Sequence, residues 1–192
     1  MNLAMELGLY SMLPAAFYDL CRHPPSRIVV GTVSTPPVTG IDPVAQNADN
    51  TSLMCLSPDF LFRTLLGREC CQHFVADFIE QGIKRRRPSI DCVHANNEDD
   101  NANQECPCRQ SFYYLTLNIL RAVGGIADGR DADALYTLIQ ATEMLSRTDF
   151  SDGEKQCSLK ICTACKNDFS KEAKKAREEV WASIPKWFGL GS

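Results

Sequence analysis

The chain has 192 residues, of which 44% are hydrophobic, and a formal net charge of −4. This composition is typical of one globular domain with its own core, and its acidic balance argues against a surface that wraps nucleic acid. No run of about 18 apolar residues is present, so a membrane span is excluded on length. The apolar start has no basic n-region and makes a poor signal peptide. We therefore expect a cytoplasmic and/or nuclear protein that is not secreted and not bound to membrane.

The N-terminal stretch predicts two short helices, over residues 2–8 and 11–22. Ser11 is a candidate cap for the second helix, and Pro14 suits its first turn. Phe17 and Cys21 are expected to face inward, and His23-Pro24-Pro25 ends the helix.

Residues 24–56 are rich in Pro, Gly, Asn and Asp and read as a long loop or insertion with one strand-like run, Ile28-Val29-Val30.

A helix is predicted after this loop. Ser57-Pro58-Asp59 supplies a cap, an N1 proline and an early acid, and the predicted helix runs to about Gln81, where Gly82 closes it. Its apolar stripe is expected to consist of Leu61, Leu65, Phe74 and Phe78.

A basic run, Lys84-Arg85-Arg86-Arg87, comes after this helix. It fits a minimal nuclear-localisation or phosphate-binding patch. The alternative, which we favour, is a set of cations placed against the dipole of a helix C-terminus.

The second polar segment, 93–107, is an acidic solvated loop. After it, residues 109–123 predict a buried helix. Asp131 is a candidate cap for a further helix. The inward-facing positions of these two helices are expected to be Phe112, Leu115, Ile119, Val123, Leu135, Leu138, Ile139 and Leu145.

The clearest amphipathic pattern covers residues 162–184, with Pro185 as the expected stop. Its apolar positions are Cys165, Phe169, Ala173, Ala176, Val180 and Ile184. We expect the tail residues Trp181, Ile184 and Phe188 to be buried against the helix at 109–123. The fold class predicted for the single domain 1–192 is all-α, an irregular bundle of about five or six helices with two long polar loops.

Ten cysteines in a chain without a secretory signal are expected to be reduced. Cys162 and Cys165 form a C-x2-C pair, and Cys92 with Cys106 or Cys108 can supply the second pair of a structural zinc site. In this arrangement Cys157 is spare. The competing interpretation is that these thiols are buried and pack as small hydrophobes, with disulfides as a third possibility. The sequence leaves these interpretations open.

The three histidines, His23, His73 and His94, are scattered, although His94 is close enough to Cys92 to be an alternative ligand. No hydrolase, metalloprotease or phosphate-loop motif is present. We therefore expect no enzymatic activity and assign no catalytic residues and no cofactor other than the candidate zinc.

Two stretches resemble a known family. NLAMELGLYSMLPAAFYDLCR is similar to the helices that follow the BTB (POZ) domain in fungal, basidiomycete-type, BTB proteins. The closing CSLKICTACKNDFSKEAKKAREEVWASIPKWFGL is similar to the end of those proteins. Its match is carried by Trp181, Ile184, Pro185, Phe188, Gly189 and Leu190.

The BTB fold itself would lie before residue 1, and BTB-mediated dimerisation and cullin-ligase recruitment belong to that missing part. The resemblance therefore implies a non-enzymatic, helical protein-interaction module with a protein partner. The alternative is a zinc-stabilised nuclear module that contacts nucleic acid through Lys84–Arg87. Without its neighbour, the N-terminal face is expected to expose Leu3, Leu7, Tyr10 or Met12 and to favour self-association.

Overall fold

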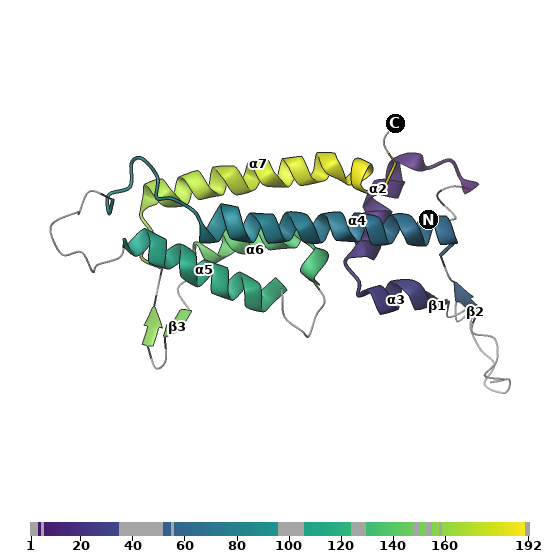
Figure 1. Ribbon diagram of the computed structural model, residues 1–192, viewed down its shortest axis with the longest axis horizontal. Helices are drawn as coiled ribbons and strands as arrows, with labels where there is room; N and C mark the ends of the chain where they lie inside the picture. The colour runs from purple at the N-terminus through teal and green to yellow at the C-terminus, as the bar shows by residue number, and fades with distance from the viewer. Residues whose placement is uncertain are drawn as a thin grey trace, which may run out of the picture.

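The computed structural model describes residues 4, 6–34, 52–54, 56–95, 106–123, 130–147, 150–152, 155–157 and 159–190, and it is all-α, as predicted (Figure 1). The helical elements are η1 (Tyr10–Met12), α2 (Leu13–Cys21), α3 (Pro25–Val30), α4 (Pro58–Asp77), η2 (Phe78–Lys84), α5 (Pro107–Val123), η3 (Arg130–Ala132), α6 (Ala134–Met144) and α7 (Thr163–Trp187). Two short antiparallel hairpins, which the sequence did not suggest, pair β1 (Thr32–Ser34) with β2 (Ser52–Met54) and β3 (Phe150–Asp152) with β4 (Lys155–Cys157).

The long helices run lengthwise through an elongated molecule, with α4 and its continuation η2 beside α7 (Figure 1). Helix α7 packs on α6 and also contacts α4 and α2, whereas α5 packs on η2 and α6. Residues 35–51 of the predicted loop 24–56 and residues 96–105 of the predicted loop 93–107 lie outside the described residues.

Helix α4 begins as predicted. The Ser57 hydroxyl accepts the N–H of Phe60 at 3.3 Å, Pro58 occupies the first turn, and Asp59 lies at the positive end of the helix dipole. The predicted apolar stripe is confirmed only in part: Leu61, Leu65, Phe74 and Phe78 are all half-buried, but Phe74 and Phe78 pack against the core. The buried face consists of Thr64, Gly67, Arg68, Cys71 and Val75.

Gly82 does not end this helix, which continues as the π-helical η2 to Lys84. A side chain at position 82 would begin 3.0 Å from Cδ2 of Phe78. This glycine therefore marks a close approach of a ring to the backbone and not a stop.

The prediction that Pro185 ends α7 is also wrong, since the helix includes this residue and ends at Trp187. Gly189, with φ of 62°, is the actual stop. The N–H of Leu190 bonds the carbonyl of Pro185 at 2.7 Å, and the N–H of Gly189 bonds that of Lys186 at 3.1 Å. A glycine in the left-handed region thus ends the helix, and these two hydrogen bonds satisfy carbonyls of its last turn.

Three smaller predictions about single residues or short runs are wrong. Ile28–Val30 is helical and not a strand, since Pro25 starts α3 and Gly31, with φ of 81°, ends it. Ser11 makes no cap, and α2 begins after Met12. Asp133 caps α6, accepting the N–H of Tyr136 at 3.1 Å, whereas the Asp131 carboxylate binds Arg68 and Gln72 of α4.

The C-terminal tail is buried, but not where we expected it. Ile184 and Phe188 are each 1% exposed, whereas Trp181 is 57% exposed and its predicted burial is wrong. Phe188 stacks on Phe17 of α2, with ring centroids 5.4 Å apart, and its ring lies against Gly67 of α4. The tail therefore closes the α2–α4 end of the bundle and not the α5 end.

The predicted inward faces of the two middle helices are largely confirmed, with Phe112, Leu115, Ile119, Leu138 and Leu145 at 5% exposure or less. Ile139 is instead exposed. At the N-terminus Leu7, Tyr10 and Met12 are exposed as expected, and Leu3 lies outside the described residues. Self-association through this face stays a prediction.

Candidate metal centre

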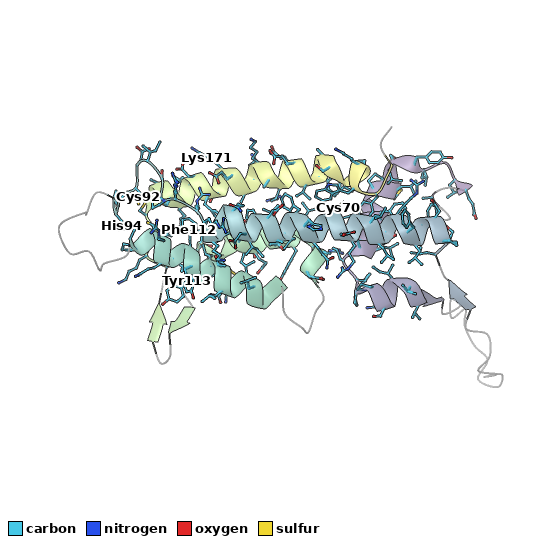
Figure 2. The ribbon with its side chains drawn as sticks, viewed as in Figure 1. Cys70, Cys92, His94, Phe112, Tyr113 and Lys171 are labelled. Carbon is cyan, nitrogen blue, oxygen red and sulfur yellow. The ribbon has the colours of Figure 1, made fainter. Side chains whose placement is uncertain are left out.

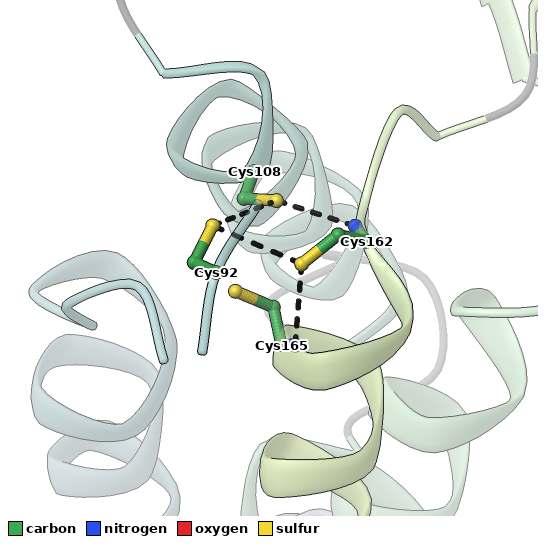
Figure 3. Close-up of side chains that lie close together, drawn as sticks. All are labelled: Cys92, Cys108, Cys162 and Cys165. Atoms are coloured by element: carbon green, nitrogen blue, oxygen red, sulfur yellow. Dashed lines mark hydrogen bonds between the residues drawn. The ribbon is translucent and has the colours of Figure 1, made fainter. Parts of the chain in front are cut away.

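Four buried cysteines from three separate segments meet at one end of α7 (Figure 3). The sulfurs of Cys92, Cys108, Cys162 and Cys165 all lie within 4.8 Å of one another. Cys92 Sγ is 3.7 Å from Cys108 Sγ and 3.8 Å from Cys162 Sγ. The sulfurs therefore point towards one another and not into separate apolar pockets, as unrelated packing thiols would.

The helices explain how three of these thiols are positioned. Cys162 is the N-cap of α7 and Cys165 lies in its first turn, while Cys108 lies in the first turn of α5. The positive ends of two helix dipoles therefore face the cluster and favour thiolates there. Cys92 comes from a turn in which its own N–H bonds the carbonyl of Ser89 at 3.0 Å.

Backbone donors surround the sulfurs. The N–H of Cys162 donates to Cys108 Sγ at 3.2 Å, that of Ser89 to Cys165 Sγ at 3.3 Å, and that of Cys165 to Cys162 Sγ at 3.5 Å. His94, the residue noted as an alternative ligand, places Nδ1 3.1 Å from Cys108 Sγ. Figure 2 shows it near Cys92, at the same end of the molecule. Such donors stabilise sulfur as a thiolate and orient it.

The thiol pKa values differ across the cluster. Burial raises the pKa of Cys162, but the N–H of Cys165 and the neighbouring thiols outweigh this and lower it to about 7. Burial raises the pKa of Cys165 to about 11 despite the N–H of Ser89, and it raises the pKa of Cys108 as well. Among Cys108, Cys162 and Cys165, Cys162 is therefore the thiol whose pKa lies lowest without a metal, and a divalent cation would displace the remaining protons.

The geometry fits a tetrahedral thiolate site. Metal–sulfur bonds of about 2.3 Å separate the sulfurs of a tetrahedron by about 3.8 Å. Two of the six sulfur pairs are 3.7 and 3.8 Å apart, and all six lie within 4.8 Å. Since Cys92, Cys108, Cys162 and Cys165 are all buried and near enough to share one ion, the cluster can hold a metal.

The other cysteines are placed elsewhere. Cys106, named with Cys108 as the alternative fourth ligand, is half-buried and outside the group, packed against the core. Cys21 and Cys71 form a separate buried pair, with sulfurs 3.9 Å apart, between α2 and α4. The side chain of Cys157 lies outside the described residues. Sequence spacing alone could not choose between Cys106 and Cys108, which are two residues apart.

Three cations of the basic run pair with carboxylates of the same chain, and Arg87 is exposed. Arg86 is 10% exposed at its side chain, forms a two-point ion pair with Glu172 of α7, and lies 5.2 Å above the ring of Phe169. Lys84 and Arg85 both bind Glu80, and their charge lies near the end of η2, as the favoured interpretation expected. Arg86 thus ties η2 to α7, a role that the sequence pattern did not reveal because Glu172 is 86 residues away.

Comparisons of this chain with protein-family models, with curated proteins and with solved structures find no match. Among the residues that the structure describes, no helix combines the length and apolar character needed to cross a bilayer.

Proposed function

We propose that this chain is a non-enzymatic helical protein-interaction module with one structural zinc ion. The ion would be held by Cys92, Cys108, Cys162 and Cys165. The observation that carries the proposal is the buried quartet of sulfurs, which ties the turn at 89–95 to the start of α5 and α7. Zinc suits this donor set, because soft thiolates in a tetrahedron favour zinc over hard cations.

A structural role follows from the donor count. Catalytic zinc sites use three protein ligands and leave one position for water or substrate, whereas structural sites are closed by four. Four thiols are available here, and all are buried. The ion would therefore contribute to folding and take no part in a reaction.

The interaction role is supported by apolar side chains left in water along the bundle, among them Phe62, Tyr113 and Leu120. It also agrees with the similarity of both chain ends to the helical region after the BTB domain. Contact with nucleic acid is less well supported, because the chain is acidic overall and Glu172 holds Arg86. Lys84 and Arg85 pair with Glu80 but stay exposed, as does Arg87.

Elemental analysis of protein purified under reducing conditions tests the metal. We expect about one equivalent of zinc, and a cobalt-substituted form with the visible absorption of a tetrahedral thiolate site. Cys92→Ser and Cys162→Ser should each lose the metal. Cys70→Ser is the matched control, because Cys70 is half-buried on α4 and outside the quartet (Figure 2). Protein without metal, or a Cys70→Ser variant that loses it equally, would overturn the zinc assignment.

A second experiment tests the interaction role. A protein partner that co-purifies after nuclease treatment supports it. A salt-dependent gel shift with DNA or RNA that disappears in a Lys84→Ala, Arg85→Ala, Arg87→Ala variant would favour nucleic-acid binding instead.

A further inference from the structure

The outer side of α5 carries apolar side chains beside a groove. Tyr113, Leu117 and Leu120 are spaced by four and three residues, so they share one face of the helix, and they are 58%, 39% and 47% exposed. Tyr113 is on the side of α5 turned away from α7 (Figure 2). A ridge of this kind, with 4-3 spacing, is the seam with which one helix packs on another.

The groove runs between this ridge and the outer side of α4 and η2. Its volume is about 320 Å³, and its lining residues are Ala76, Ile79, Glu80, Lys84, Tyr113, Thr116, Leu117 and Leu120. The ridge and groove are therefore adjacent parts of one surface, which we call the α5–η2 face. A helix that docks into such a groove needs an apolar ridge of its own.

The charges along this face have opposite signs at its two ends. At the end near Tyr113, Lys84, Arg85 and Arg109 are exposed; Glu80 pairs with the first two, so this end keeps a net positive charge. At the end near Leu120, Glu69 and Asp77 are exposed. When two copies of the face meet antiparallel across a two-fold axis, the basic end of one lies over the acidic end of the other. This arrangement is self-complementary in charge as well as in shape.

We propose that the α5–η2 face is a homodimer interface, in which the Tyr113–Leu117–Leu120 ridge of each copy fills the groove of the other. The inference deepens the proposed interaction role and rests on it. Covering these side chains in both copies would bury only about 600 Å², well below a standard interface, which places the dimer among weak, reversible interfaces. The dimer therefore forms at high protein concentration and dissociates on dilution.

Sedimentation equilibrium over a wide concentration series, on protein with its metal content verified, tests this proposal. Leu117→Asp should weaken dimerisation by about tenfold or more, because it places a charge at the centre of the apolar contact. Leu66→Asp is the matched control on the same molecule, since Leu66 is also exposed (43%) but lies outside the groove lining. Circular dichroism and melting confirm that each variant is folded.

Charge reversal provides a second variant pair. Asp77→Lys and Lys84→Glu should each weaken self-association. In a two-fold dimer of either variant, positions 77 and 84 meet twice and carry the same charge at both contacts. A mixture of the two variants restores both contacts and should form a heterodimer with near wild-type affinity.

A folded wild type that stays monomeric at all concentrations would overturn the homodimer. So would a dimer that Leu117→Asp leaves intact but Leu7→Asp abolishes, which would move self-association to the N-terminal face. Either result, with one equivalent of zinc still bound, would leave the zinc-stabilised module standing and remove only this interface.

Discussion

The two ends of α7 are held by different physical means (Figure 1). At its C-terminal end, aromatic packing dominates: Phe188 stacks on Phe17, which also meets the ring of Phe60 edge-on at 5.6 Å. At its N-terminal end, Phe169 packs on Phe78 and Phe112, and beyond these rings four sulfurs converge on the turn at 89–95. Among the described residues between Ile83 and Cys108, only Cys92 is buried.

This difference gives a physical reason why a metal would stabilise one end more than the other. Large aromatic side chains bury apolar area between α2, α4 and α7, and Arg63 and Arg68 add hydrogen bonds to the carbonyls of Gly189 and Cys21. The turn at 85–95 has no comparable side chains, so its ordering entropy is not offset by hydrophobic burial. A metal bound to the four thiolates would supply that missing free energy, because binding energy at a structural site becomes folding energy. The two ends should therefore respond differently to the same perturbations.

The largest expected effect is zinc removal. A strong chelator should lower the melting temperature by roughly 10 °C or more. Hydrogen exchange should show lost protection first in the turn at 89–95 and the first turns of α5 and α7, while α2 and the middle of α4 keep theirs. Uniform loss of protection across the chain would show that the two ends are not separate in stability.

The second effect concerns the aromatic end. Phe188→Ala should cost about 3–5 kcal/mol of unfolding free energy, because it leaves a cavity among Phe17 and Gly67. Denaturant unfolding measures this, and the zinc content of the folded variant should not change. Trp181→Ala is the control. With Trp181 57% exposed, its cost should stay below about 1 kcal/mol, and an equal loss in both variants would contradict the observed packing.

Gly67→Ala should have an intermediate effect at the same end. A Cβ at this position would lie 2.0 Å from Cε1 of Phe188, so the ring must move. We expect a net cost of about 1–3 kcal/mol, although alanine favours helix more than glycine does. In a Phe188→Leu background the same substitution should cost less. If the costs simply add in a double-mutant cycle, the two positions do not interact.

The smallest effect is a pH dependence at Tyr18. Burial raises the pKa of this phenol well above its ordinary value of 10.0, the N–H of Leu135 opposes this, and the Asp133 carboxylate raises it further. A folded pKa above the unfolded value contributes stability that is fully present below about pH 10 and is lost as pH rises beyond it. The loss should be about 1 kcal/mol per pH unit.

The Tyr18→Phe variant isolates the contribution of Tyr18 to this pH dependence. The variant should be less stable near neutral pH by about 1 kcal/mol, since the hydrogen bond from Tyr18 to Asp133 at 2.8 Å is lost. Between about pH 10 and pH 11 the gap to wild type should narrow, because only wild type has the phenol to ionise. Urea unfolding at both pH values measures the gap, and a constant gap would show that Tyr18 does not titrate with folding.

The sequence by itself determined much of the local structure. The Ser57-Pro58-Asp59 start of α4 and the apolar stripe of α7 were predictable, because caps and amphipathic faces depend on residues within a few turns of each other. The C-x2-C spacing likewise predicted a pair of convergent thiols at Cys162 and Cys165. The all-α class followed from these local patterns.

Only the tertiary structure decided the rest, because those outcomes depend on contacts between residues far apart in the chain. Arg86 is not a free cation, since Glu172 and Phe169 of α7 meet it. Cys108 and not Cys106 completes the quartet, because the start of α5 directs Cys108 into the cluster with Cys92 and the α7 pair. Such choices are settled by three-dimensional packing, which no local pattern encodes.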